Sequence, residues 1–221
     1  MSRFMIKRLI LGPVVAALTA ICLTAPAAAA PIPPLNTAEI KAALLSTSQI
    51  GAGYEAKKAR YSLVIPLKAT YPTAACNKAL KAYDKAVRGR PVTTITFRNE
   101  ETVTAVSHAV VTGTPTFLNS IANGAKAIGR YCHGLRPKSA TDRTKIVRKA
   151  VPNLGQTTSA FRFTEHPDST AATFDVVFIR YRSALAVVQR VSIQTEDEWP
   201  QTVAIAKKAA AKLKAVYAKR G

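Results

Sequence analysis

The sequence predicts an α+β domain in which about four helices pack on a central, mostly antiparallel sheet, with one disulfide. Three observations predict this class. Segments with the apolar spacing of amphipathic helices are interspersed with segments rich in β-branched residues. The strand-like segments occur in pairs separated by short turns, which is typical of antiparallel hairpins. About 185 residues follow the N-terminal leader, a length that suits one domain with its own core.

Four segments have helical periodicity, and local signals mark their ends. The predicted helices are 36–45, 73–87, 114–132 and 200–218. Asn36 is placed to cap the first helix, because Glu39 follows three residues later as in a capping box. Gly89 is predicted to end the second helix, and Pro115 lies in the first turn of the third.

Seven segments have the composition of strands. They are 54–67, 92–97, 102–111, 145–151, 159–164, 173–181 and 185–193. The second and third flank a short acidic turn and predict a hairpin. The last two give the strongest strand signals in the chain, with only a short break at Arg182 and Ser183 between them. The stretch 46–53, which contains Gly51 and Gly53, is predicted to be a loop.

The first thirty residues have the three parts of a secretory signal peptide. Arg3, Lys7 and Arg8 lead into the apolar run 9–20, and the small-residue stretch 25–30 follows it. The sequence therefore predicts an exported protein that is secreted or associated with the cell envelope.

The leader divides the chain into three predicted parts: a cleaved signal peptide at 1–29, a proline-rich spacer at 30–35 and a single domain at 36–221. Two alternatives stay open. An uncleaved leader would tether the domain to the membrane, although its apolar run is short for a span of about 20 residues. Acylation of Cys22 would instead make the chain a lipoprotein.

The chain is strongly basic. Its formal net charge is +20, and loss of the three cations of the leader lowers this to +17. Such a field attracts polyanions, which outside a cell are wall polymers, anionic lipid head groups or phosphorylated glycans. Nucleic acid is not expected as a partner, because the basic residues are scattered and no nucleic-acid-binding motif occurs.

Two of the predicted helices carry basic stripes. These are Lys78, Lys81, Lys85 and Arg88 on the second helix, and Lys208, Lys212 and Lys219 on the last. The lysines of the last helix are predicted to face water. For the stripe of the second helix, a solvated face and a contact with an anion are the two alternatives.

Two cysteines, Cys76 and Cys132, remain after removal of the leader. In an exported protein such a pair predicts a disulfide rather than a metal or redox site, and two buried free thiols are the alternative. Both cysteines lie on predicted inner faces, so their bond would join the second helix to the third. Closing a loop of this length would stabilise the fold by about 4 kcal/mol.

The sequence contains no motif for catalysis, metal binding or cofactor binding, so none of these is predicted. His108, His133 and His166 lack the spacing of metal ligands. Ser107 and His108 are neighbours on a predicted strand, so their side chains point to opposite faces and cannot form a nucleophile–base pair. Nucleophile elbows and glycine-rich phosphate loops are also absent from the sequence.

The start of the last helix has two notable features. Glu196, Asp197 and Glu198 precede or open this helix, where acids complement the positive end of the helix dipole. Trp199 follows them. A packing anchor and a platform for a ligand are the two interpretations of this tryptophan.

The order of several segments carries a family resemblance. The segments are 44–54 (LLSTSQIGAGY), the stretch around Cys76, 128–132 (IGRYC), 151–155 (VPNLG), 159–162 (SAFR) and 176–180 (VVFIR), followed by an alanine- and lysine-rich helix. Together they resemble the extracellular sensor domain of PknH-like actinobacterial serine/threonine kinases, a family that also includes secreted proteins and lipoproteins.

The resemblance implies an α+β domain with a largely antiparallel central sheet, a groove for an extracellular ligand and no catalysis. The chain departs from the family in two respects. The kinase sensor domain has two disulfides, whereas Cys76 and Cys132 can form only one. The chain also contains no kinase domain. The resemblance assigns no ligand-binding residues.

The predicted function is a secreted, non-enzymatic, ligand-binding and sensor-like domain of the bacterial cell envelope. Its ligand is unknown, an anion is one candidate, and a monomer is expected. The membrane is a partner only if the leader is retained. Two alternatives are a cationic protein held on anionic wall polymer or lipid head groups, and a secreted hydrolase with dispersed catalytic residues.

Overall fold

In the computed structural model, the part of the chain that contains the helices and strands begins at Ile32. The described residues are 32–57, 70–138, 144–165, 172–193 and 197–220. The predicted leader, its cleavage site and most of the predicted strand 54–67 lie outside these ranges.

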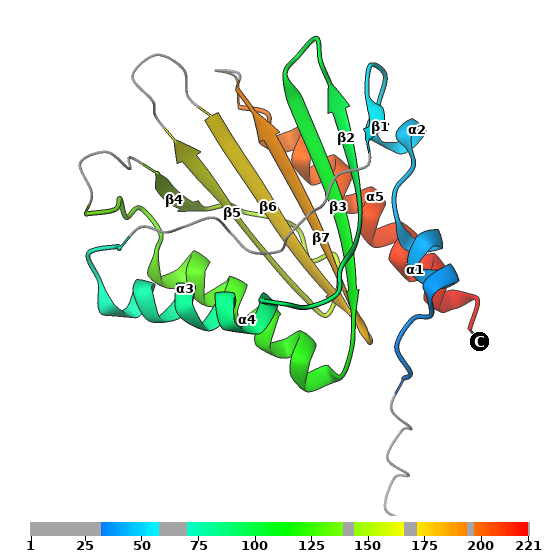
Figure 1. The fold of residues 1–221 in the computed structure, drawn as a ribbon, viewed down its shortest axis with the longest axis horizontal. Coiled ribbons are helices and arrows are strands. Elements are labelled where there is room, and N and C mark those ends of the chain that lie inside the picture. The colour runs from blue at the N-terminus through cyan, green and yellow to red at the C-terminus, as the bar shows by residue number, and fades with distance from the viewer. Residues whose placement is uncertain (1–31, 58–69, 139–143, 166–171, 194–196, 221) are drawn as a thin grey trace, which may run out of the picture. The chain divides into compact units, whose positions relative to one another are not determined.

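A seven-stranded, fully antiparallel sheet forms the centre of the fold (Figure 1). Its spatial order is β1-β2-β3-β7-β6-β5-β4. The strands are β1 (Glu55–Lys57), β2 (Thr93–Asn99), β3 (Thr104–Thr112), β4 (Lys145–Arg148), β5 (Thr157–Glu165), β6 (Ala172–Tyr181) and β7 (Ala184–Ser192). The predicted α+β class with an antiparallel sheet is confirmed.

Helices cover both faces of the sheet (Figure 1). They are α1 (Thr37–Ala43), α2 (Thr47–Ile50), α3 (Ala74–Val87), α4 (Pro115–Tyr131) and α5 (Trp199–Ala218). Helices α3 and α4 lie on one face, and α1, α2 and α5 lie on the other. The single turn α2 corrects the prediction of a loop at 46–53, because four residues are too few to show helical periodicity. No described helix is both long and apolar enough to cross a membrane.

The caps explain where the helices begin. The Asn36 side chain accepts a hydrogen bond from the Glu39 N–H at 3.0 Å, and Glu39 Oε2 accepts one from the Asn36 N–H at 2.7 Å. This is the predicted capping box. Gly89 follows the last residues of α3 with a φ of +70°, which a glycine adopts without steric cost.

The core has two parts because neighbouring strand residues alternate between the two faces. On β7, Val188 packs beneath α5, and the adjacent Val187 packs beneath α3 and α4. Both side chains are almost fully buried. Ser107 and His108 on β3 likewise point to opposite faces, as predicted: Ser107 Oγ lies 2.9 Å from Thr96 Oγ1, whereas His108 is enclosed on the α5 face.

The predicted Cys76–Cys132 disulfide is present and joins the first turn of α3 to the C-cap of α4. Both cysteines are fully buried, and their Cα atoms lie 4.9 Å apart. The two helices approach closely at Gly124, where a Cβ atom would lie 3.2 Å from the Cα of Tyr83. The small residue and the disulfide therefore hold α3 against α4 as a unit.

Two of the α5 lysines that were predicted to face water also contact the segment that precedes the sheet; Lys208 is exposed and Lys212 is half-buried. Lys208 Nζ donates a hydrogen bond to the Gln49 carbonyl at 2.7 Å, and Lys212 Nζ donates one to the Leu44 carbonyl. These carbonyls lie at the ends of α2 and α1, where backbone acceptors lack helical partners. The two lysine side chains therefore connect α1 and α2 to α5 through hydrogen bonds.

Candidate functional site

A pocket of about 540 Å³ lies between α4 and the strands β4 and β5. Its described lining residues are Lys126, Gly129 and Arg130 of α4, Arg148 to Val151 at and after the end of β4, and Thr158 to Ala160 of β5. Strand β4 is the last strand of the sheet (Figure 1), so the pocket that its end lines lies near an edge of the sheet.

The unequal lengths of two strands create this pocket. Strand β4 pairs only with the far half of β5, from Phe161 to Thr164, whereas β5 begins earlier, at Thr157. The backbone after β4 adds one further bond, from the Lys149 N–H to the Ala160 carbonyl at 3.1 Å. The segments beyond that point, Ala150 to Val151 and Thr158 to Ser159, line the pocket together with residues of α4.

The stem of Arg148 lies beside Gly129 of α4. A Cβ atom at Gly129 would lie 3.7 Å from Cγ of Arg148, in ordinary van der Waals contact. The aliphatic part of Arg148 therefore lies against the helix backbone, while the residue as a whole remains exposed. This arrangement keeps the guanidinium at the pocket.

The pocket is strongly basic. Lys126, Arg130, Arg148 and Lys149 line it, and none of its described lining residues is acidic. Lys126 and Arg130 are one helical turn apart on α4. These two residues and Arg148 are exposed, and none of the three forms an ion pair with a described residue. Because like charges repel, such a group favours an anion between them.

One residue that lines the pocket, Ser159, has a hydroxyl group without a hydrogen-bond partner among the described residues. Its Oγ atom is shielded from solvent. An unsatisfied buried polar atom costs about 1–3 kcal/mol. Next to it on β5, the Thr158 hydroxyl accepts a hydrogen bond from the Leu154 N–H at 3.0 Å. The wall therefore combines cations with hydroxyl groups.

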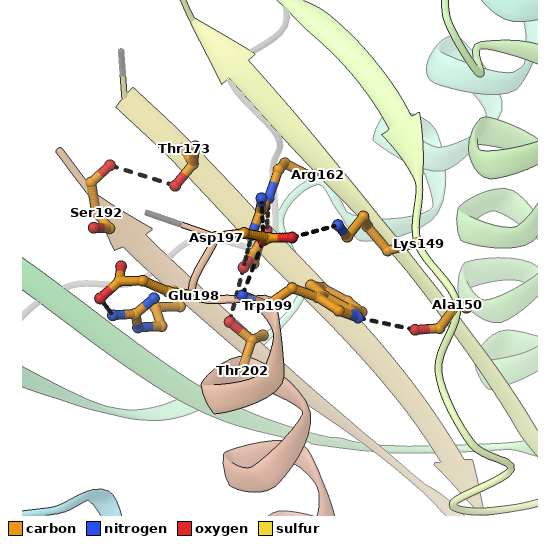
Figure 2. Close-up of polar contacts among 11 residues, drawn as sticks. Lys149, Ala150, Arg162, Thr173, Ser192, Asp197, Glu198, Trp199 and Thr202 are labelled. Atoms are coloured by element: carbon orange, nitrogen blue, oxygen red, sulfur yellow. Dashed lines mark hydrogen bonds and ion pairs between the residues drawn. The ribbon is translucent and has the colours of Figure 1, made fainter. Parts of the chain in front are cut away.

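An ionic network lies beside the pocket, where α5 meets the sheet (Figure 2). Arg162 on β5 binds Asp175 on β6 with two hydrogen bonds, and its third nitrogen, Nη1, donates to Asp197 Oδ1 at 2.7 Å. Thr202 on α5 donates to Asp175 Oδ2 at 2.8 Å. The hydrogen bond from Arg162 holds the pKa of the Asp197 carboxyl below its usual range.

A second ion pair completes the network. Arg190 on β7 pairs with Glu198, and both side chains are largely buried. Burial would raise the pKa of Glu198, but the hydrogen bonds from Arg190 and Ser192 outweigh this effect, so its pKa lies below the usual value. The acids before α5 were predicted to complement the helix dipole. The structure shows that Asp197 and Glu198 also bind arginines of the sheet, whereas Glu196 lies outside the described residues.

Lys149 and Trp199 connect the network to the pocket. Lys149 Nζ lies 3.6 Å from Asp197 Oδ2 and 5.3 Å from the centroid of the Trp199 ring. The indole Nε1 of Trp199 donates to the Ala150 carbonyl at 3.0 Å, and Ala150 lines the pocket (Figure 2). Trp199 is buried in the core cluster, as the packing interpretation predicted.

The histidines are used as backbone acceptors. His108 Nδ1 accepts a hydrogen bond from the Leu45 N–H at 3.1 Å, and His133 Nδ1 accepts one from the Arg148 N–H at 3.0 Å. Burial lowers the pKa of His108 to about 3, with a smaller contribution from the charge of Lys212. His166 lies outside the described residues. Within those ranges, no three His, Cys, Asp or Glu side chains gather as metal ligands would.

Sequence reasoning missed the cations of the pocket. Lys126 and Arg130 have the i, i+4 spacing of neighbours on one helix face, and Arg148 and Lys149 are adjacent at a strand end. Each pair is an ordinary surface feature by itself. The sequence drew attention to a different basic stripe, on α3, whose residues are Lys78, Lys81, Lys85 and Arg88. This stripe is exposed to solvent, and its Arg88 forms an ion pair with Asp84 of α3.

Comparisons with known proteins give a relationship at the level of the fold. No family model matches the chain, and no curated protein matches it. The crystal structure of the extracellular domain of PknH from Mycobacterium tuberculosis matches with a TM-score of 0.50 and 18% identity, over 84% of this chain and 98% of that one. The structure of an uncharacterised Rv0999 ortholog from Mycobacterium smegmatis gives a TM-score of 0.47 and 11% identity, over 76% and 92% of the two chains. The chain therefore has a PknH-like extracellular domain fold.

Proposed function

We propose that this protein is an extracellular, non-enzymatic, sensor-like domain that binds a ligand in the basic pocket. The observation that carries the proposal is the match to the PknH extracellular domain over 98% of that domain's length. The predicted leader and the Cys76–Cys132 bond support an extracellular location, since disulfides persist in oxidising compartments.

The state of the carboxylates near the pocket supports a role without catalysis. General acid–base catalysis requires a group that exchanges protons near the working pH. Asp175, Asp197 and Glu198 are each held by an arginine, and hydrogen bonds keep the pKa values of the last two low. Carboxylates fixed in this way serve as anchors for α5.

Secretion of the full-length chain from an actinobacterial host tests the extracellular location. We expect the protein in the medium or the envelope fraction, with a mature N-terminus near Ala30 and with Cys76 and Cys132 oxidised, as measured by intact mass before and after alkylation. Recovery from the cytoplasm with Met1 or Ser2 at the N-terminus and with two alkylatable thiols would contradict the proposal.

A second candidate function is electrostatic attachment to anionic wall polymer. Two features favour it: the exposed stripe on α3, with Lys78, Lys81 and Lys85, and the net charge, which is +20 for the full chain and +17 without the three cations of the leader. Attachment of this kind weakens as salt screens the charges. Sedimentation with isolated cell walls at low and at high salt tests this, and retention that is equal at both concentrations would exclude electrostatic attachment.

A further inference from the structure

We propose that the ligand of the basic pocket is a small phosphorylated sugar or polyol. This inference rests on the proposed function as a ligand-binding domain and specifies the chemical class that its site accepts. Two properties of the pocket point to this class: its uncompensated positive charge, and its size together with the hydroxyl-bearing residues that line it. The contact of the pocket with Trp199 supplies a means to detect binding.

The charge favours a phosphate group. Three cations, Lys126, Arg130 and Arg148, meet at the pocket without an ion-pair partner among the residues that the structure describes. Two of them are arginines, whose planar guanidinium groups bind phosphate through paired hydrogen bonds. A phosphate monoester carries nearly two negative charges at neutral pH. It therefore relieves more of the repulsion between these cations than a single carboxylate does.

The size of the pocket and its hydroxyl groups favour a larger body attached to that phosphate. A volume of about 540 Å³ falls within the range of small-molecule sites and exceeds the need of a lone phosphate ion. Thr158 and Ser159 of β5 are among the lining residues; the Thr158 hydroxyl accepts a hydrogen bond from the Leu154 N–H, and Ser159 Oγ has no partner among the described residues. Hydroxyl groups of a sugar or polyol can both donate to and accept from such groups.

The fluorescence of Trp199 can report binding in this pocket. Lys149 lines the pocket, yet its ammonium group also lies 3.6 Å from Asp197 and above the ring of Trp199. This is a loose ion pair, because Asp197 is largely exposed and already accepts from Arg162. A phosphate beside Lys149 competes for its charge and changes the electric field at the indole. Trp199 is the single tryptophan of the chain, so its fluorescence reports this event without a label.

Fluorescence titration of the full-length chain tests the inference. Glucose 6-phosphate, inorganic phosphate and glucose are the three probes, each at constant ionic strength. We expect a saturable change in Trp199 emission with glucose 6-phosphate, a weaker response to phosphate and none to glucose. The expected Kd for glucose 6-phosphate is about 10 μM to 1 mM, the range of modest small-molecule affinity.

A matched pair of variants separates the pocket from the general charge of the protein. Arg130→Gln with Arg148→Gln removes two cations at the pocket, and Lys78→Gln with Lys81→Gln removes two cations from the exposed stripe of α3. The pocket variant should bind about tenfold or more weakly, because each lost contact is a charge-assisted hydrogen bond. The α3 variant should bind like the wild type. Thermal unfolding of both variants checks that they fold.

Each result of these titrations supports or overturns a specific part of the inference. Equal weakening in both variants would show diffuse electrostatic binding and overturn the inference. Inorganic phosphate that binds as tightly as glucose 6-phosphate would overturn the sugar or polyol component. A response to glucose alone would overturn the anion component and leave a ligand-binding domain in place. Failure of the secretion experiment would reject the extracellular function itself, independently of these titrations.

Discussion

Arg162 on β5 donates two hydrogen bonds to the carboxylate of Asp175 on β6, from Nε to Oδ1 at 2.6 Å and from Nη2 to Oδ2 at 2.9 Å. The Asp175 side chain is only 2% exposed, and Thr202 of α5 binds the same carboxylate. The pair therefore joins two neighbouring strands to the first turn of α5. Because α5 also holds α1 and α2, this one contact supports most of the layer on that face.

Loss of this pair should strongly destabilise the fold. Arg162→Met leaves the Asp175 carboxylate buried without its cation, and we expect a loss of about 3–5 kcal/mol in the free energy of unfolding. Urea denaturation followed by circular dichroism measures it. The matched change Lys149→Gln removes a looser and more exposed ion pair and should cost about 1 kcal/mol or less. Similar losses in the two variants would show that the buried pair has no special role.

The disulfide should account for a large part of the stability. Reduction, or the double variant Cys76→Ala with Cys132→Ala, opens a loop with a sequence separation of 56 residues. The chain-entropy model gives a loss of about 4 kcal/mol for such a loop. Urea denaturation of the wild type with and without reductant measures the effect, and the double variant serves as the control because it should not respond to reductant. A wild type that is equally stable in both conditions would contradict this expectation.

His108 should make the protein less stable as the pH falls. Burial holds the pKa of the folded state at about 3, below the ordinary value of 6.5. Between these two values the unfolded state binds a proton that the folded state does not, so the stabilisation is complete above pH 6.5 and declines toward pH 3. His108→Gln should have a flatter stability profile in this window.

Urea denaturation at several pH values measures both profiles. His108→Gln should also be less stable than the wild type at pH 7, because the Leu45 N–H loses the acceptor that the ring provides. A slope that is the same in the wild type and in His108→Gln would contradict the assignment.

The β2–β3 turn contains a strained residue that glycine should relieve. Val103 has a φ of +50°, a region that β-branched residues rarely occupy, and it is 58% exposed. Val103→Gly should raise the free energy of unfolding by about 1 kcal/mol, because the steric penalty exceeds the added chain entropy. Glu101→Gly in the same turn lacks this relief and should lower stability, by about 0.5–1 kcal/mol. Thermal and urea unfolding compare the two variants with the wild type. If Val103→Gly is less stable than the wild type, the backbone at Val103 is not strained.

The local sequence predicts most of the fold. The Asn36–Glu39 capping box, Gly89 after α3 and Pro115 in the first turn of α4 each act within a few residues, so they are visible without any tertiary contact. The strand pairs follow from composition and short turns in the same way. The pairing of Cys76 with Cys132 followed from their number and their predicted inner faces.

Only the tertiary structure decided the candidate site. Lys126 and Arg130 come from a helix, and Arg148 and Lys149 come from a strand end about twenty residues later; they meet because β4 is shorter than β5 and leaves a space beside α4. The sequence by itself determined most of the elements, the disulfide and the strongly basic character, but not the short helix α2. It did not determine which charges find partners, because ion pairs and hydrogen bonds form through space between segments whose separation along the chain carries no periodic signal.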